Sequence, residues 1–261
     1  MELVLRQFDY WATTYRRTWR GSVVSSFVMP LLFLTAMGVG LGGYVDDSDG
    51  PQTLGGVSYL AFIAPGLLAT TAMQTAVFES TYPVFGNLKW NKVYSSMTAT
   101  PLRAVDILNG HLLYVGFRLA TTCAVFLVVL AAFGVAGSVV GALGALLVAV
   151  LVGMACATPV FGYSMWIKTD AGFAVLFRLG LIPMFLFSGA FFPVAQMPDT
   201  IEWLAYVTPV WHGVELCRAF TLGTASWWPS IGHVAYLLGW VVVGWLWARK
   251  SFEHRLVEGG S

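Results

Sequence analysis

Long apolar runs separated by short polar stretches dominate the sequence, and they predict six membrane-spanning helices. A helix needs roughly 20 mostly apolar residues to cross about 30 Å of hydrocarbon. The fifth run is the least regular, because Arg178 interrupts it and leaves residues 179–192 as its continuous apolar part. The six predicted spans are residues 21–43, 59–85, 112–134, 137–161, 172–192 and 231–247.

A helix with a different pattern precedes the first span. Large apolar side chains recur there every three or four residues, and the arginines fall mainly on the other sides of the helix. Residues 1–20 are therefore predicted to form an amphipathic helix that lies flat in the lipid headgroup layer. Two roles are open for it: a positively charged anchor, or a mechanical element packed against the spans and a partner. The apolar stripe consists of Val4, Phe8, Trp11, Tyr15 and Trp19.

The segment between the fifth and sixth predicted spans, residues 193–230, is too apolar for water, yet none of its pieces is long enough to cross a bilayer. Prolines divide it and predict two short helices, at residues 199–206 and 210–222. A re-entrant helical hairpin that dips part-way into the outer leaflet, shielded by the spans, satisfies both constraints. Glu215 and Arg218 are three residues apart on the second helix and are predicted to pair. The dividing prolines are Pro193, Pro198 and Pro209.

Composition supports the bilayer environment. Hydrophobic residues make up 57% of the 261 residues and charged residues only 10%, whereas a soluble globular domain carries about 25% charged residues. A soluble protein with six buried helices of this length would need a polar shell that the sequence lacks. The predicted fold is an all-α polytopic membrane protein, with residues 1–261 forming a single transmembrane domain.

The basic residues predict the orientation, because short loops rich in lysine and arginine stay in the cytoplasm. Thirteen of the fourteen lysines and arginines fall on one side of the predicted topology, and only Arg218 falls on the other. The basic side carries the N-terminal segment, the loops after the second and fourth spans, and the C-terminal tail. Both termini are therefore predicted to be cytoplasmic, and residues 193–230 to be external.

The sequence contains no residue pattern typical of an enzyme. It has no G-x-x-x-x-G-K-[ST] phosphate loop, no H-E-x-x-H motif, no G-x-S-x-G motif and no C-x-x-C pair. The four histidines are far apart in sequence and are expected to be interfacial, and the three cysteines are expected to be small apolar fillers. We therefore expect no catalytic, cofactor-binding or metal-binding residues in this chain. The net charge of +1 does not indicate a nucleic-acid partner.

One charged residue stands inside a predicted span. Glu79 lies about six residues before the end of the second span, roughly 9 Å deep at 1.5 Å per residue, where a charge is costly and needs a partner. Three interpretations are open: an ion pair that ties the span to its loop, a role in gating, or a direct contact with a substrate. The candidate countercharges are Lys89, Arg118 and Arg178.

Three motifs resemble those of one transporter family. Residues 187–193 read F-S-G-A-F-F-P, residues 214–223 read V-E-L-C-R-A-F-T-L-G, and residues 78–101 read F-E-S-T-Y-P-V-F-G-N-L-K-W-N-K-V-Y-S-S-M-T-A-T-P. In this order, and with the spans over essentially the whole chain, they resemble type-2 ATP-binding-cassette (ABC) exporter permeases. The similar branch includes Nod-factor (lipo-oligosaccharide) and daunorubicin exporters. One departure is His111, at a position where the family pattern has an acidic residue.

The resemblance implies that the loop after the second span carries a coupling helix, which docks in a groove of a separate ATPase subunit. In this chain that role falls to residues 87–100. Its apolar residues would form the docking face, and its lysines would flank that face. The alternative is an amphipathic loop that faces lipid. The residues expected to contact the ATPase are Lys89, Trp90, Val93, Tyr94 and Met97.

The same resemblance implies that the chain is the permease subunit of an ATP-driven exporter in the bacterial cytoplasmic membrane. The partner ATPase would bind ATP and Mg²⁺, and a second permease copy, identical or paralogous, would complete a lipid-embedded pathway along spans one, two and five. The implied substrate is amphipathic, a drug-like molecule or a lipid-linked saccharide. The alternatives are a secondary transporter without an ATPase, an intramembrane enzyme and a scaffold protein. An internal repeat of the kind common in secondary transporters is not evident in the sequence.

Overall fold

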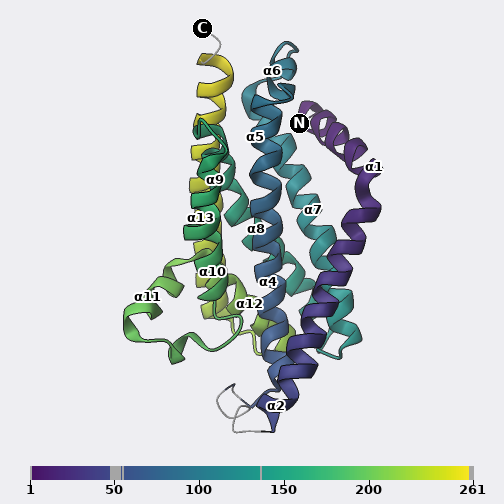
Figure 1. Cartoon of the computed structure of the whole chain (residues 1–261), viewed down its shortest axis with the longest axis vertical. Coiled ribbons are helices and arrows are strands. Elements are labelled where there is room, and N and C mark those ends of the chain that lie inside the picture. Colours follow the sequence, from purple (N-terminus) through teal and green to yellow (C-terminus); the bar gives the residue numbers. More distant parts are fainter. Residues whose placement is uncertain (1, 48–53, 55, 136, 259–261) are drawn as a thin grey trace.

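The computed structural model describes residues 2–47, 54, 56–135 and 137–258, and no β-strand occurs in this part of the chain. Most helices run along the long axis of the molecule, whereas α11 and α12 lie toward its lower end (Figure 1). The helix bounds in chain order are α1 Glu2–Phe33, η1 Leu34–Leu41, α2 Gly42–Asp46, α4 Tyr59–Ser80, α5 Tyr82–Lys89, α6 Val93–Thr98, α7 Ala104–Ala132, α8 Val139–Trp166, α9 Ala171–Val175, η2 Leu176–Leu181, α10 Ile182–Leu186, η3 Val194–Gln196, α11 Asp199–Val207, α12 Pro209–Leu222, α13 Trp227–Glu253 and η4 His254–Glu258.

Five of the six predicted spans have a helical counterpart that is long and apolar enough to cross a membrane. The predicted fifth span, residues 172–192, corresponds to a shorter apolar stretch, Ala171–Leu186. At 1.5 Å per residue that stretch is about 24 Å long, less than the roughly 30 Å of hydrocarbon. Its helix ends early because the chain turns at Gly189, where φ is +74°. The five long stretches among the described residues are Phe27–Asp46, Tyr59–Lys89, Ala104–Ala132, Val139–Trp166 and Trp227–Leu256.

The predicted surface helix at residues 1–20 and the first span are joined in one helix, α1, which runs without a break from Glu2 to Phe33. Figure 1 shows that α1 bends along its length. The apolar stripe of its first half covers α7: the Phe8 ring meets Phe117 edge-on at 5.8 Å, and Trp11 is only 7% exposed. Of the two roles predicted for this segment, these contacts fit an element packed against the spans.

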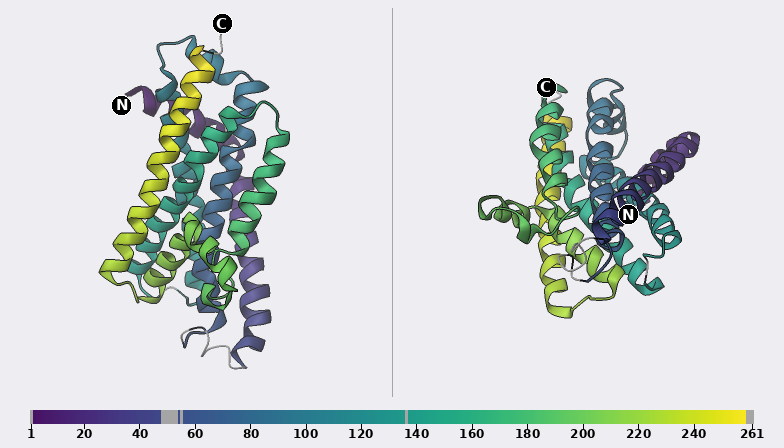
Figure 2. Two further views of the ribbon diagram at one scale, coloured as in Figure 1. Left: turned by 90° about the vertical axis from the view of Figure 1, so that its left-hand side faces the viewer. Right: turned by 60° about the horizontal axis from the view of Figure 1, so that its bottom comes forward.

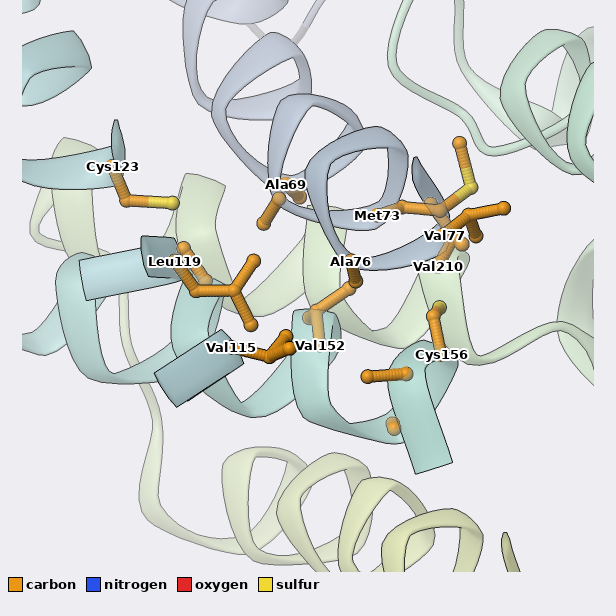
Figure 3. Packing of buried hydrophobic residues seen from close by; sticks show 14 of the residues in the cluster. Ala69, Met73, Ala76, Val77, Val115, Leu119, Cys123, Val152, Cys156 and Val210 are labelled. Atoms are coloured by element: carbon orange, nitrogen blue, oxygen red, sulfur yellow. The ribbon is translucent and has the colours of Figure 1, made fainter. Parts of the chain in front are cut away.

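Helix α8 packs on α4, α7, α12 and α13 and is the centre of the bundle. Figure 3 shows the region where Met73 and Ala76 of α4 meet Leu119 of α7 and Val152 of α8, all of which are fully buried. A Cβ on Gly153 would lie 2.5 Å from Leu119 Cδ1, so α7 and α8 approach closely there. In lipid, burying apolar surface contributes little free energy to helix association, so helices associate through close packing. Small residues such as Gly153 allow that close packing.

The stretch formed by α9, η2 and α10 packs mainly on itself and lies at the edge of the bundle (Figure 2). Aromatic rings make its contacts with α4 and α5: Phe177 lies 5.6 Å from Phe78, and Phe173 lies 4.8 Å from Tyr82. Rings hold helices further apart than the glycines around α8 do. The fifth apolar stretch is therefore attached more loosely than the other long helices.

The segment 193–230 contains the two predicted helices, α11 and α12, each within about one residue of the predicted bounds. Pro193 precedes the short turn η3, Pro198 precedes α11, and Pro209 is the first residue of α12, positions that a proline tolerates. Helix α12 packs on α4 and α8. Both helices lie toward the end of the molecule opposite α6 and the two termini (Figure 1).

Helix α4 meets the backbone of the 188–193 turn at Gly66, so a side chain there should destabilise the fold. A Cβ on Gly66 would lie 2.7 Å from the Cα of Ala190. We expect Gly66→Ala to lower the free energy of unfolding by about 1 to 3 kcal/mol, the usual cost of overpacking, measured by unfolding in lipid discs. Gly239→Ala in α13 is the matched control, because no atom outside the adjacent residues and local backbone of its own helix lies within 4 Å of its Cβ position. Equal stability of the two variants would contradict this contact.

Candidate functional site

A cavity of about 670 Å³ lies between α1, α4, α7 and α10. Two of these helices line it with side chains of opposite character, which makes the cavity two-sided. Helix α4 contributes mostly polar residues: Thr70, Thr71, Gln74, Thr75 and Glu79. Helix α1 contributes apolar residues: Met29, Pro30, Leu32 and Phe33.

The helical repeat of α4 puts its polar side chains in one strip. Thr71, Gln74 and Thr75 are spaced by three residues and one residue, so they share a face. Thr70 bonds to the carbonyls of its own helix, but the other three side chains have no hydrogen-bond partner among the described residues. All three side chains are half-buried and line the cavity, so their polar atoms remain accessible from it. This polar strip is therefore suited to hydrogen bonds with a molecule that enters the cavity.

Glu79 lies at the end of the polar strip and is paired with Arg118 of α7. The Nε of Arg118 lies 3.0 Å from Oε1 of Glu79, and the two side chains are 11% and 21% exposed. The guanidinium of Arg118 also lies 4.5 Å from the centre of the Tyr15 ring on α1. Of the three candidate countercharges, Arg118 is the partner, and the interaction connects α1, α4 and α7 beside the cavity.

The predicted coupling helix at residues 87–100 is not one helix. Helix α5 ends at Lys89, where the amides of Trp90 and Asn91 both bond to the carbonyl of Gly86. Lys92 then has a positive φ of 52°, and α6 begins at the next residue. Spacing alone suggested a continuous helix, but the left-handed residue turns the chain between two short ones.

The residues predicted to contact an ATPase are divided between two sides of this turn. Lys89, Trp90 and Lys92 are exposed, with 59% of Trp90 accessible, and Val93 is half-buried. Tyr94 and Met97 instead point into the chain's own core, with 0% and 9% of their surface exposed. The predicted apolar docking face is therefore incomplete, because two of its members anchor α6 to the bundle.

Tyr94 is held by a histidine that the family pattern did not predict. Its hydroxyl lies 2.6 Å from Nδ1 of His111 on α7, and burial raises the pKa of Tyr94 above its usual value. The His111 ring stacks on Trp11 of α1 at 4.2 Å, and Tyr94 also packs on Phe252 of α13. This junction fixes α6 to three long helices at the end of the bundle that carries both termini.

The predicted pair at the opposite end is present. Nη1 of Arg218 lies 2.7 Å from Oε1 of Glu215. Arg218 also donates from Nη2 to the carbonyl of Gly189 at 2.8 Å, and its guanidinium lies 3.9 Å from the centre of the Phe62 ring. One side chain thus connects α12 with α4 and with the turn that follows α10.

The chain matches the family described as ABC-2 type transporter over residues 6–222. It belongs to this family. Nodulation protein J of Rhizobium leguminosarum bv. trifolii is 30% identical over 267 residues, which cover 95% of this chain and 94% of that protein. Nodulation protein J of Sinorhizobium fredii is 31% identical over 224 residues, covering 80% and 79%. The daunorubicin resistance ABC transporter permease protein DrrB1 of Streptomyces coeruleorubidus is 26% identical over 218 residues, covering 79% and 70%.

Membership of the ABC-2 type transporter family confirms the resemblance inferred from the three sequence motifs. The matched region runs from the first turns of α1 to the end of α12. It therefore includes the cavity, the turn between α5 and α6, and the hairpin of α11 and α12. The cysteines are buried and free, as expected for apolar fillers.

Two features of the site were not predicted from the sequence. The spacing of Thr71, Gln74 and Thr75 inside an apolar run was a usable signal for the polar strip. No such signal existed for the contact between Tyr94 and His111, because these residues are 17 positions apart on different helices. Helical periodicity relates residues within one helix and does not indicate which neighbouring helix they meet.

Breaking the Glu79–Arg118 pair should destabilise this ABC-2 type transporter. We expect Arg118→Met to lower the free energy of unfolding by about 3 kcal/mol, because it leaves a partly buried carboxylate without its partner. The double variant Glu79→Gln/Arg118→Met should recover most of that loss. Unfolding in lipid discs measures both effects.

Arg249→Met is the matched control for that comparison. It breaks the pair with Glu253, whose side chains are 48% and 42% exposed, and exposed pairs contribute at most about 1 kcal/mol. An Arg118→Met variant as stable as Arg249→Met would show that the pair beside the cavity has no structural role.

Proposed function

We propose that this ABC-2 type transporter chain is the permease subunit of an ATP-driven exporter whose ATPase is a separate chain. Family membership and a relative named as an ABC transporter permease support this function. The sequence has no phosphate loop to hold a nucleotide. ATP and Mg²⁺ are therefore assigned to the partner subunit, and this chain contributes the pathway.

The two-sided cavity is the observation that carries the proposal. An amphipathic molecule has hydrogen-bonding groups and an apolar part, which match the polar strip on α4 and the apolar side chains of α1. Phe126 of α7 and Phe185 of α10 add aromatic surface. We infer that the cavity takes up a drug-like molecule or a lipid-linked saccharide from the cytoplasm or the inner leaflet. Relatives named for nodulation and for daunorubicin resistance are consistent with this substrate class.

A second permease copy, identical or paralogous, is proposed to complete the pathway. Three of the four helices that line the cavity, α1, α4 and α10, belong to the predicted spans one, two and five. The loose attachment of α9, η2 and α10 suits an element at the boundary between two copies. When nucleotide binding draws the ATPases together, the two permeases would shift between populated states and open the cavity outward.

Six crossings and a re-entrant hairpin are part of this proposal. The stretch Ala171–Leu186 would be the fifth crossing, because a bilayer thins locally around a short apolar helix at modest cost. Helices α11 and α12 would dip into the outer leaflet, where α4 and α8 shield α12. An even number of crossings puts both termini on the same side of the membrane. The basic residues assign that side, which also carries α6, to the cytoplasm.

The exposed side of the α5–α6 turn is proposed as the contact with the ATPase. Trp90 offers a large apolar surface, and Lys89 and Lys92 flank it. Tyr94 and Met97, assigned to docking from the sequence, are proposed instead to hold α6 in position. Tryptophan is enriched among the residues that contribute most to binding in protein interfaces.

Replacement of Trp90 tests the docking contact. We expect Trp90→Ala to reduce the amount of ATPase that co-purifies with the tagged chain by about tenfold, since a central interface tryptophan contributes well over 1.4 kcal/mol. Quantitative mass spectrometry of the purified complex measures the ratio. Trp203→Ala is the control, because Trp203 is equally exposed, at 59%, but lies on α11.

Two outcomes separate the alternatives. If both tryptophan variants retain the ATPase, the assignment of Trp90 to docking is wrong, but the proposed function as an exporter subunit still holds. If the wild-type chain carries no ATPase in detergents or in lipid discs, the secondary transporter becomes the leading function.

The polar strip gives a second test, with daunorubicin as the probe. Gln74→Leu removes hydrogen-bonding capacity worth about 1 kcal/mol, so we expect the KM for daunorubicin export from vesicles to rise about fivefold. The amount of bound ATPase should not change, because Gln74 is remote from the α5–α6 turn. Gln196→Leu, an exposed position in η3, is the control. An unchanged KM for Gln74→Leu would remove the polar strip from the pathway.

A further inference from the structure

Two histidines that are distant in sequence meet at the end of the molecule that carries the hairpin. Nδ1 of His212 in α12 lies 2.7 Å from Nδ1 of His233 in α13. Nε2 of His212 lies 3.0 Å from the carbonyl oxygen of Tyr206 in α11. The contact joins α11, α12 and α13, none of which lines the cavity.

The partners determine where the protons are. A carbonyl oxygen can only accept, so Nε2 of His212 carries a hydrogen and donates it to Tyr206. In a neutral ring Nδ1 of His212 is then bare and accepts a hydrogen bond. The hydrogen between the two rings therefore belongs to Nδ1 of His233, and Nε2 of His233 is left as an acceptor.

The surroundings hold both rings in this arrangement. Tyr236 stacks on His212 with ring centres 4.0 Å apart, and its hydroxyl donates to the carbonyl of Val207 at the end of α11. The Trp211 ring meets His212 and His233 edge-on at 4.9 and 5.3 Å. The rings cannot turn away from one another without disturbing the contacts of the hairpin with α13.

This geometry responds differently to a first and a second added proton. The first can bind Nε2 of His233, which leaves the hydrogen bond between the rings in place and makes its donor a cation. The second has to bind Nδ1 of His212, the atom that accepts the bond. Two like charges would then face each other across the former hydrogen bond, and the contact would open.

The other charged and titratable groups around the pair already have partners. The Tyr206 hydroxyl donates to Glu202 on α11, and Glu215 pairs with Arg218 on α12. Burial and the charge of His233 lower the pKa of His212 below its ordinary value. The ordinary pKa of histidine is about 6.5. Because the pKa of His212 is lowered in the closed contact, neutral His212 stabilises that contact at pH values above about 6.5, and this stabilisation is lost as the pH falls.

A bound metal ion is a less suitable occupant than a proton. Among the residues described, no third histidine, cysteine, aspartate or glutamate joins the pair in a metal-binding group. Structural zinc sites use four protein ligands, and the separation of 2.7 Å is that of a hydrogen bond.

We propose that the His212–His233 hydrogen bond is a proton-controlled latch that fastens the hairpin of α11 and α12 to α13. The latch stays closed while at most one added proton resides on the pair, and it opens when both rings are charged. External acidification would thereby loosen α11 and the start of α12 from α13, while α12 stays packed on α4 and α8. The latch acts on the hairpin whether or not an ATPase is bound.

Hydrogen exchange of the full chain in lipid discs tests the latch. Between about pH 7.5 and about pH 5, we expect protection of the α11 amides, corrected for intrinsic exchange, to fall about tenfold. His233→Phe keeps an aromatic ring but has no nitrogen, so it should show low protection at both values. His254→Phe, in η4 just beyond the far end of α13, should behave as the wild type. The proposal would be overturned if protection of the α11 amides in the wild type were the same at both pH values, or if His233→Phe showed the full fall in protection.

Spectroscopy of the wild-type chain gives a test that needs no variant. With ¹⁵N-labelled histidine at about pH 7.5, we expect the Nε2–H tautomer for His212 and the Nδ1–H tautomer for His233, coupled through one hydrogen bond. The opposite tautomers, or two charged rings at that pH, would rule out the latch even if His233→Phe fails to fold.

Discussion

The bilayer supplies no hydrogen-bond partners, so the chain itself has to satisfy every polar group inside the bundle. Two arginines show how it does so. Arg118 neutralises Glu79 and lies over a ring of α1, and Arg218 combines a carboxylate, a carbonyl and a ring from three parts of the chain. Each arginine connects helices that apolar packing alone would hold weakly in lipid. The arrangement of the helices depends on both of these interactions.

The polar side chains that line the cavity differ from those inside the bundle. Thr71, Gln74 and Thr75 are half-buried on the wall of the cavity, and no side chain or carbonyl of the described chain bonds to them. A stable core would have apolar residues there. Polar side chains on the wall of a cavity stay free to bind another molecule, and a transport pathway is a place where a passing molecule does so.

Sequence patterns predicted the features that are determined within a single helix. They identified the apolar runs, the bounds of α11 and α12, and the Glu215–Arg218 pair, because these follow from composition, proline positions and helical spacing. They failed where two helices meet. Tyr94 looked like part of an exposed stripe, but its direction depends on His111, and Glu79 had three candidate partners until the packing of α4 on α7 selected Arg118. The turn at Lys92 was missed because a positive φ at a lysine has no sequence signal.

The contrast between glycine contacts and aromatic contacts sets the mechanical stiffness of the molecule. Around α8, backbones touch, so a displacement of one helix forces its neighbours to follow, and that part responds as a rigid block. Around α9, η2 and α10, aromatic rings separate the helix backbones, so fewer backbone contacts oppose a displacement there. Elastic deformation of the chain will therefore concentrate in the fifth apolar stretch. Surroundings that change the tilt of this stretch need not alter the rigid block of helices around α8.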